Sequence, residues 1–219
     1  MRARIGLIGS LLTLPFLAGC FDMSQDLTIT SNGTSTMVVT LAMATDMLGM
    51  MEAEGDGGEF CPAEDEDSGL PDSFTTEVEV ITEGDNTICR MTATGPIADM
   101  AAALASGELM PGDDDEGAPT VTLVDEGGGV YLYSVSITIP DSDPVGEDVS
   151  EEERAMNEQM QAMMRGMFEG HTMSWSVTAP RIIDTDAERD GNTIRYSIPL
   201  TAMVDNVGET FGFMVRFGL

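Results

Sequence analysis

Few residues in this chain are of the types that most often carry out chemistry: one histidine and three cysteines among 219 residues. The histidine, His171, follows the expected end of a helix at Gly170, where the helix dipole favours a cation. That place suits a capping or surface residue better than the general base of an enzyme. The sequence also has no nucleophile elbow, phosphate-binding loop or zinc-protease helix. It therefore predicts a protein that is not an enzyme and that holds no cofactor.

A run of alternating carboxylates raises the question of calcium, which takes oxygen ligands from closely spaced acidic residues. These carboxylates are Asp184, Asp186, Glu188 and Asp190. An EF-hand that began at Asp186 would need a glutamate at its twelfth position, where Ser197 stands. We therefore expect this stretch to be a hairpin loop, with no metal site.

Cys20 ends an N-terminal segment with the composition of a secretory leader. Two arginines open the segment, residues 5–17 form an apolar run, and the small residues Ala18 and Gly19 precede the cysteine. The segment resembles the signal peptide and lipobox of bacterial lipoproteins. We therefore expect residues 1–19 to be removed and Cys20 to receive acyl chains, since more than one chain is needed for stable anchoring. An ordinary secretory signal that is cleaved without lipidation is the alternative.

Two cysteines remain once Cys20 is assigned to lipid. An extracytoplasmic location permits disulfides, so Cys61 and Cys89 are expected to pair and to join an acidic, glycine-rich loop to a strand. Closing such a loop stabilises a fold by roughly 3 to 4 kcal/mol. Two free buried thiols are the alternative, and a zinc site is less expected because no histidine lies near either cysteine in the sequence.

The charge of the chain limits its partners. Without the two arginines of the leader, seven basic residues face 39 acidic ones, a formal net charge of −32. Phosphate binding needs clustered cations, so nucleic acid is excluded as a partner. The negative charge also repels anionic lipid head groups, so the protein must attach to the membrane through the acyl chains on Cys20. Much of the acidity falls in expected loops near 52–72 and 111–119.

The elements that would position these residues are mostly strands. Turn residues and alternating apolar residues predict three hairpins, which pair residues 27–30 with 36–43, 75–82 with 87–94, and 120–125 with 130–139. A short helix is expected from Pro96 to Ala105, and further strands at 172–178, 192–199 and 210–217. We expect one domain over residues 20–219 of the α+β class, a mainly antiparallel sheet built from hairpins with two or three helices packed on one face.

A capping box at Ser150–Glu153 predicts the start of a longer helix whose apolar residues recur every three or four positions. The candidate face for an apolar ligand consists of Met160, Met163, Met164, Met167 and Phe168, with Trp175 nearby. Thioethers adapt to varied apolar surfaces, which favours a lipid or a partner as ligand. The alternative, which we favour, is that this face packs on the sheet as ordinary core, since an amphipathic helix must bury its apolar side.

Three segments carry a family resemblance. The first is Cys20 followed closely by residues 27–34, LTITSNGT; the second is residues 78–105, expected as strand, strand and helix. The third is residues 173–180, MSWSVTAP, which lead to the hairpin DGNTIRYSIPL at 190–200. Together they resemble the LppM domain family, a group of bacterial envelope lipoproteins named for a mycobacterial member. The resemblance implies a lipoprotein of the envelope and, from the role proposed for that member, binding of a lipid or glycolipid.

These observations predict a lipid-anchored protein of the bacterial cell envelope, without enzymatic activity, that binds a lipid or another apolar ligand. In a Gram-negative cell, Phe21 rather than aspartate after Cys20 indicates the periplasmic side of the outer membrane. The alternative is a structural or assembly lipoprotein that contacts other envelope proteins through its acidic loops.

Overall fold

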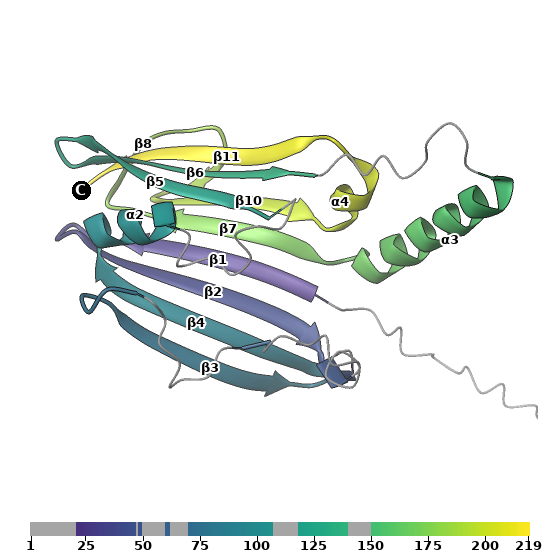
Figure 1. The fold of residues 1–219 in the computed structure, drawn as a ribbon. Helices are drawn as coiled ribbons and strands as arrows, with labels where there is room; N and C mark the ends of the chain where they lie inside the picture. Colours follow the sequence, from purple (N-terminus) through teal and green to yellow (C-terminus); the bar gives the residue numbers. More distant parts are fainter. Residues whose placement is uncertain (1–20, 47, 50–59, 62–69, 107–117, 140–149) are drawn as a thin grey trace, which may run out of the picture.

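The computed structural model describes residues 21–46, 48–49, 60–61, 70–106, 118–139 and 150–219. They form a sandwich of two β-sheets with helices at its side and end (Figure 1). The expected signal peptide, Cys20 and most of both acidic loops lie outside the described residues.

The larger sheet has the strand order β3-β4-β2-β1-β7-β10-β9. Its strands are β1 (Phe21–Ile29), β2 (Thr34–Ala44), β3 (Thr75–Glu83), β4 (Asn86–Pro96), β7 (Thr172–Thr178), β9 (Glu188–Asp190) and β10 (Thr193–Pro199). All neighbours pair antiparallel except β1 and β7, which run parallel with Met23 opposite Met173. The larger sheet is therefore mixed, and β1 and β7 begin at the same end of the molecule.

The smaller sheet is antiparallel, in the order β5-β6-β11-β8. Its strands are β5 (Thr120–Gly127), β6 (Val130–Thr138), β8 (Arg181–Thr185) and β11 (Thr210–Gly218). Strict alternation places one face of each strand in the core and the other in solvent, as on β6, where Tyr131, Tyr133, Val135 and Ile137 are buried. The two sheets pack through such faces, and their apolar residues form one cluster.

The helices occupy different places on this sandwich. Helix α2 (Ile97–Ser106) packs beside β5 and buries Ile97, Met100 and Leu104. Helix α3 (Glu151–Phe168) projects beyond the strand ends, next to the short helix α4 (Thr201–Asp205) (Figure 1). Among the described residues, no helix is both long and apolar enough to cross a membrane.

The α+β class and the mainly antiparallel pairing are confirmed, and each of the three hairpins lies where the sequence predicts it. The turn at Asn32-Gly33 has the positive φ, 82° at Gly33, that only glycine adopts readily. The prediction of helices packed on one face is wrong, because α3 stands at the end of the sandwich. Strands β8 and β9 occupy residues for which the sequence predicts a hairpin loop.

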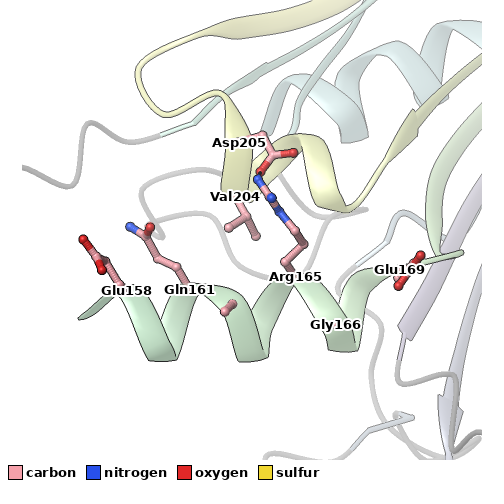
Figure 2. Close-up of a pocket in the computed structure, with 8 residues that line it drawn as sticks. Glu158, Gln161, Arg165, Gly166, Glu169, Val204 and Asp205 are labelled. Atoms are coloured by element: carbon pink, nitrogen blue, oxygen red, sulfur yellow. Dashed lines mark hydrogen bonds and ion pairs between the residues drawn. The ribbon is translucent and has the colours of Figure 1, made fainter. Parts of the chain in front are cut away.

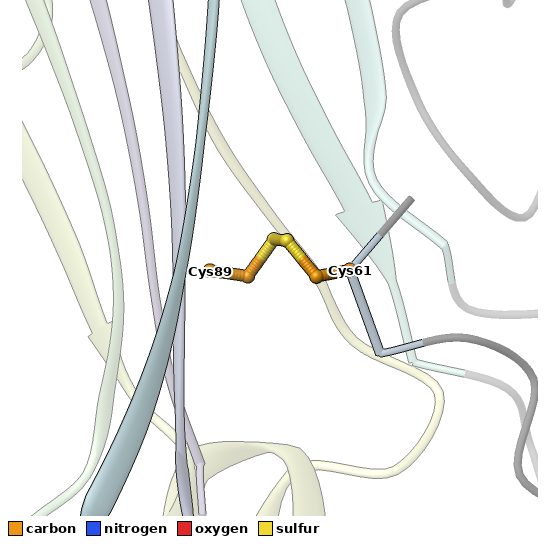
Figure 3. The surroundings of a disulfide bond; sticks show 2 residues. All are labelled: Cys61 and Cys89. Atoms are coloured by element: carbon orange, nitrogen blue, oxygen red, sulfur yellow. A yellow bond between two sulfur atoms is a disulfide. The ribbon is translucent and has the colours of Figure 1, made fainter. Parts of the chain in front are cut away.

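The expected disulfide between Cys61 and Cys89 is present, with a Cα–Cα distance of 5.6 Å (Figure 3). Cys89 lies on β4 and is completely buried. The bond therefore attaches the chain segment around Cys61 to the larger sheet, and the alternative of two free thiols is wrong.

Candidate functional site

Helix α3 carries an exposed apolar surface that the fold leaves uncovered. Met156, Met160 and Met163 have exposed fractions of 65%, 51% and 61%, and we call these three residues the methionine surface. They recur at spacings of four and three, so they lie along one stripe of the helix. The interpretation that this face packs on the sheet as ordinary core is therefore wrong for these three residues.

The opposite side of α3 is polar and faces the domain. Arg165 lies nine positions after Met156, which at 3.6 residues per turn places it about 180° around the helix. Its guanidinium donates a hydrogen bond to the carboxylate of Asp205 on α4, as Figure 2 shows. The helix is thus attached through its polar side, and its apolar stripe turns outward.

A groove of about 560 Å³ lies between α3 and α4. Its lining is mostly polar (Figure 2) and comes from Glu158, Gln161, Ala162, Arg165, Gly166, Glu169, Val204 and Asp205. Because carboxylate, amide and guanidinium groups dominate this lining, the groove suits water and polar groups better than an acyl chain. No local pattern in the sequence indicates this groove, since Arg165 and Asp205 are 40 residues apart.

The junction between α3 and the larger sheet is fixed by Asp22, near the start of β1. One carboxylate oxygen of Asp22 lies 2.9 Å from His171 Nδ1, and the other accepts the backbone N–H of Thr172 at 2.8 Å. His171 lies in the short connection after α3, and Thr172 is the first residue of β7. The start of β1 is therefore joined by the Asp22 side chain to the connection between α3 and β7.

The structure divides the predicted ligand face into three groups. Met160 and Met163 are exposed, whereas Met164 and Met167 are half-buried. Phe168 packs against the core cluster from the last turn of α3. Trp175 does not join this face, because it is only 2% exposed inside the sandwich.

Trp175 instead serves the core. Its ring lies 6.2 Å from that of Tyr196, which stacks on Phe213 at 5.0 Å. These contacts link β7 and β10 of the larger sheet to β11 of the smaller one. Within the described part of the chain its Nε1–H has no hydrogen-bond acceptor. On a strand whose residues alternate between polar and apolar, the apolar positions face the core. Trp175 occupies one of these positions, so it packs in the sandwich and not on the ligand face.

Three of the four carboxylates considered for calcium, those of Asp184, Asp186 and Asp190, bond to other groups in the fold. Asp186 accepts the backbone N–H of Met214 at 2.8 Å, and Asp190 pairs with Arg195 at 2.9 Å. Across the described ranges, no three acidic, histidine or cysteine side chains gather where a metal ion could be held. The segment forms strands β8 and β9 rather than a calcium loop.

The outer face of the larger sheet is rich in hydroxyl groups, a feature that no local pattern in the sequence predicts, because it depends on the order of the strands. One row of cross-strand neighbours holds threonine on six adjacent strands, namely Thr75, Thr94, Thr36, Thr28, Thr178 and Thr193. Two pairs within the row are linked by hydroxyl bonds of 3.0 and 2.9 Å. Threonine suits a pleated, solvent-facing surface, so this row stabilises the sheet.

The chain matches no family model and no curated protein sequence. It is similar in structure to the folded domain of LppM from Mycobacterium tuberculosis, solved by NMR. The two share 9% sequence identity, the superposition covers 94% of each chain, and the TM-score is 0.53. At this identity the likeness establishes the fold, so the expectation of an LppM-like domain is confirmed at the level of the fold.

Proposed function

We propose that this chain is a lipid-anchored protein of the bacterial cell envelope that binds an apolar partner through the methionine surface and catalyses no reaction. The observation that carries the proposal is the orientation of α3, whose polar side bonds to α4 while Met156, Met160 and Met163 face away. An LppM-like fold is consistent with a lipoprotein domain.

The energetics of α3 support a binding surface. Burying a methionine side chain completely stabilises by roughly 1.5 to 3 kcal/mol, whereas more than half of each of these three side chains stays in water. A partner that covers the stripe would bury the rest of these side chains, and the complex would gain the corresponding free energy. The thioether side chains are flexible and polarisable, so they can adapt to an irregular apolar surface such as lipid.

The proposal of anchoring rests on the leader and on Cys20. The apolar run, the small residues and the cysteine match a lipobox, and Cys20 directly precedes the first described strand. If the cell is Gram-negative, Phe21 after the cysteine favours the periplasmic side of the outer membrane.

The proposal of no catalysis rests on the surroundings of His171. Its Nδ1 pairs with Asp22, but Asp22 also accepts the N–H of Thr172, so the pair joins α3 to the sheet. A general base needs a nucleophile or a water at its other nitrogen, and in the described ranges no serine, threonine or cysteine side chain bonds to His171.

The test begins with the mass of the N-terminal peptide of the full-length protein purified from bacterial membranes. Acyl chains on Cys20 are expected, together with their loss and release of the protein from the membrane in the Cys20→Ser variant. An unmodified Cys20 in a protein that is fully released from the membrane would refute the anchoring.

The second part of the test compares two variants of the anchored protein. Met160→Gln with Met163→Gln should lose the apolar partner, detected by native mass spectrometry with lipid extraction and by cross-linking in membranes. The control, Ala162→Gln, introduces the same residue on the groove side of α3 and should keep the partner. Equal binding by both variants would refute the methionine surface as the site.

A further inference from the structure

The tether between the expected anchor and the folded domain is very short. Cys20 precedes Asp22 by two residues, so at most about 7 Å of chain separates their Cα atoms. Asp22 already lies in β1 and is bonded to His171 and Thr172. A cysteine that carries acyl chains would therefore hold this end of the sandwich directly against the bilayer.

Helix α3 belongs to the same end. Strands β1 and β7 are parallel, so both begin there, and α3 ends only three residues before β7 starts. The helix extends beyond the strand ends instead of folding back over a sheet (Figure 1). Its 18 residues span about 27 Å at 1.5 Å per residue, close to the hydrocarbon thickness of a bilayer. Its charged side would be costly inside the hydrocarbon, so the helix fits an orientation along the membrane surface and not across the bilayer.

We propose that the partner of the methionine surface is the bilayer that carries the anchor, with α3 lying in the interfacial region as a second point of attachment. This proposal rests on the proposed function. A single attachment lets a domain tilt and rotate, whereas an acylated Cys20 and an inserted helix face together fix its orientation. The hydroxyl-rich outer face of the larger sheet and the groove beside α4 would then keep a constant direction relative to the membrane.

The charges near α3 indicate which kind of lipid surface the helix can contact. Glu158 and Glu169 lie on the polar side of the helix with Asp205 opposite, and Arg165 is paired with Asp205. The sequence of this helix holds four glutamates and two arginines, so it offers no excess of positive charge to attract anionic head groups. The surface that fits α3 is therefore a zwitterionic phospholipid bilayer, which the apolar stripe enters to the depth of the acyl boundary.

The test uses the full-length acylated protein in phosphatidylcholine vesicles. Because Cys20 carries lipid and Cys61 bonds to Cys89, a cysteine placed on α3 is the free thiol that a nitrobenzoxadiazole label can attach to. Met160→Cys places the label on the methionine surface, and Glu158→Cys, about 160° away around the helix, is the matched control. The label at 160 should shift to shorter emission wavelength and be quenched several-fold more by spin-labelled lipid than the label at 158.

Each outcome bears on one of the two proposals. If the protein floats with the vesicles but both labels are quenched equally by a water-soluble quencher, the bilayer proposal is overturned and the anchoring stands. If the label at 160 is shielded equally without vesicles, in a manner that depends on protein concentration, the partner is a second copy and the bilayer proposal again fails. If Cys20 carries no lipid and the protein does not float, the proposed function fails with it.

Discussion

Gln25 is a polar side chain completely buried in the middle of the sandwich. Its amide nitrogen donates to the thioether of Met37 at 3.1 Å, and its carbonyl oxygen accepts the hydroxyl of Tyr133 at 3.3 Å. Tyr133 belongs to the smaller sheet and Gln25 to the larger one. The bond therefore ties the two sheets together at a defined register, which purely apolar contacts would specify less sharply.

Burial of Tyr133 leads to a prediction at alkaline pH. Burial, assisted by the negative charge of Asp26, raises the pKa of the Tyr133 phenol above its ordinary value of 10.0. In the unfolded chain the phenol loses its proton near pH 10, while the folded state retains it, so stability is present below that pH and is lost above it. For Tyr133→Phe, we expect the fall in unfolding free energy above pH 10 to be shallower by up to about 1.4 kcal/mol per pH unit.

Urea unfolding at several pH values, from roughly pH 9 to pH 11, measures this difference. A residual slope should remain in the variant, because burial also raises the pKa of Tyr131. Below pH 9 the variant should be less stable by only about 1 kcal/mol, for the lost bond to Gln25. Identical slopes in the wild type and the variant would show that Tyr133 does not resist ionisation in the folded state.

The disulfide gives a second prediction for single residues. Cys61 and Cys89 close a loop with a sequence separation of 28, so replacing both by alanine should lower the unfolding free energy by about 3 to 4 kcal/mol. Denaturant titration measures the loss, and the wild type in a reducing agent should show a similar loss. Wild-type stability in the double variant would mean that the bond constrains little of the unfolded chain.

At the scale of elements, local signals in the sequence were enough for the hairpins. A turn such as Asn32-Gly33 specifies both the reversal and the register of β1 and β2, because the two strands are adjacent in the chain. The parallel pairing of β1 with β7 joins residues 150 positions apart, and no residue pattern within either strand indicates its neighbour. The sequence therefore predicts the hairpins but not the order in which they meet.

The candidate site, too, could be predicted from the sequence only in part. The spacing of the methionines predicted that α3 has one apolar side, but helical periodicity is the same whether that side faces the core or solvent. The outward orientation accompanies contacts that are not local in the chain, namely the pair of Arg165 with Asp205 and the position of β7. Trp175 was assigned to the ligand face by proximity in sequence, although its strand turns it into the core.

The pairing of β11 with β6 leads to a prediction about Gly212. A Cβ atom at this position would lie 2.2 Å from the backbone carbonyl oxygen of Val135, which cannot rotate away as a side chain can. Gly212→Ala should therefore push the two strands apart and lower the unfolding free energy by about 1 to 3 kcal/mol.

Gly166 on α3 is the control for that measurement, since nothing lies within 4 Å of the Cβ that alanine would add there. Alanine is the better helix former by up to about 1 kcal/mol, so Gly166→Ala should not destabilise the protein. Thermal and denaturant unfolding of the two variants provides the comparison. An equal loss in both would indicate a general intolerance of alanine rather than a close approach of backbones.

For the whole molecule, the dominant property is its acidity: the formal net charge is −30 over the 219 residues, and it becomes −32 if residues 1–19 are removed as proposed. This negative charge repels an anionic membrane and so opposes contact between such a membrane and the methionine surface. The acyl chains on Cys20, in contrast, would hold the protein at the bilayer whatever the charge of its lipids. Anchoring and the contact of α3 are therefore expected to differ in their dependence on lipid composition, even though both occur at the same end of the domain.

The label at Met160→Cys makes this difference measurable. Added phosphatidylglycerol should reduce the quenching of the label by spin-labelled lipid while leaving the anchored fraction of protein unchanged. Raising the salt from 0.1 M to 1 M shortens the Debye length from about 10 Å to about 3 Å, so the quenching should recover. If phosphatidylglycerol instead strengthened the contact, an arginine of the domain such as Arg154 on α3 would have to attract the anionic head groups, and the choice of a zwitterionic surface would be wrong. If lipid charge had no effect in low salt, the helix would have to lie beyond the reach of the bilayer field, and the surface contact argued from the short tether would be wrong.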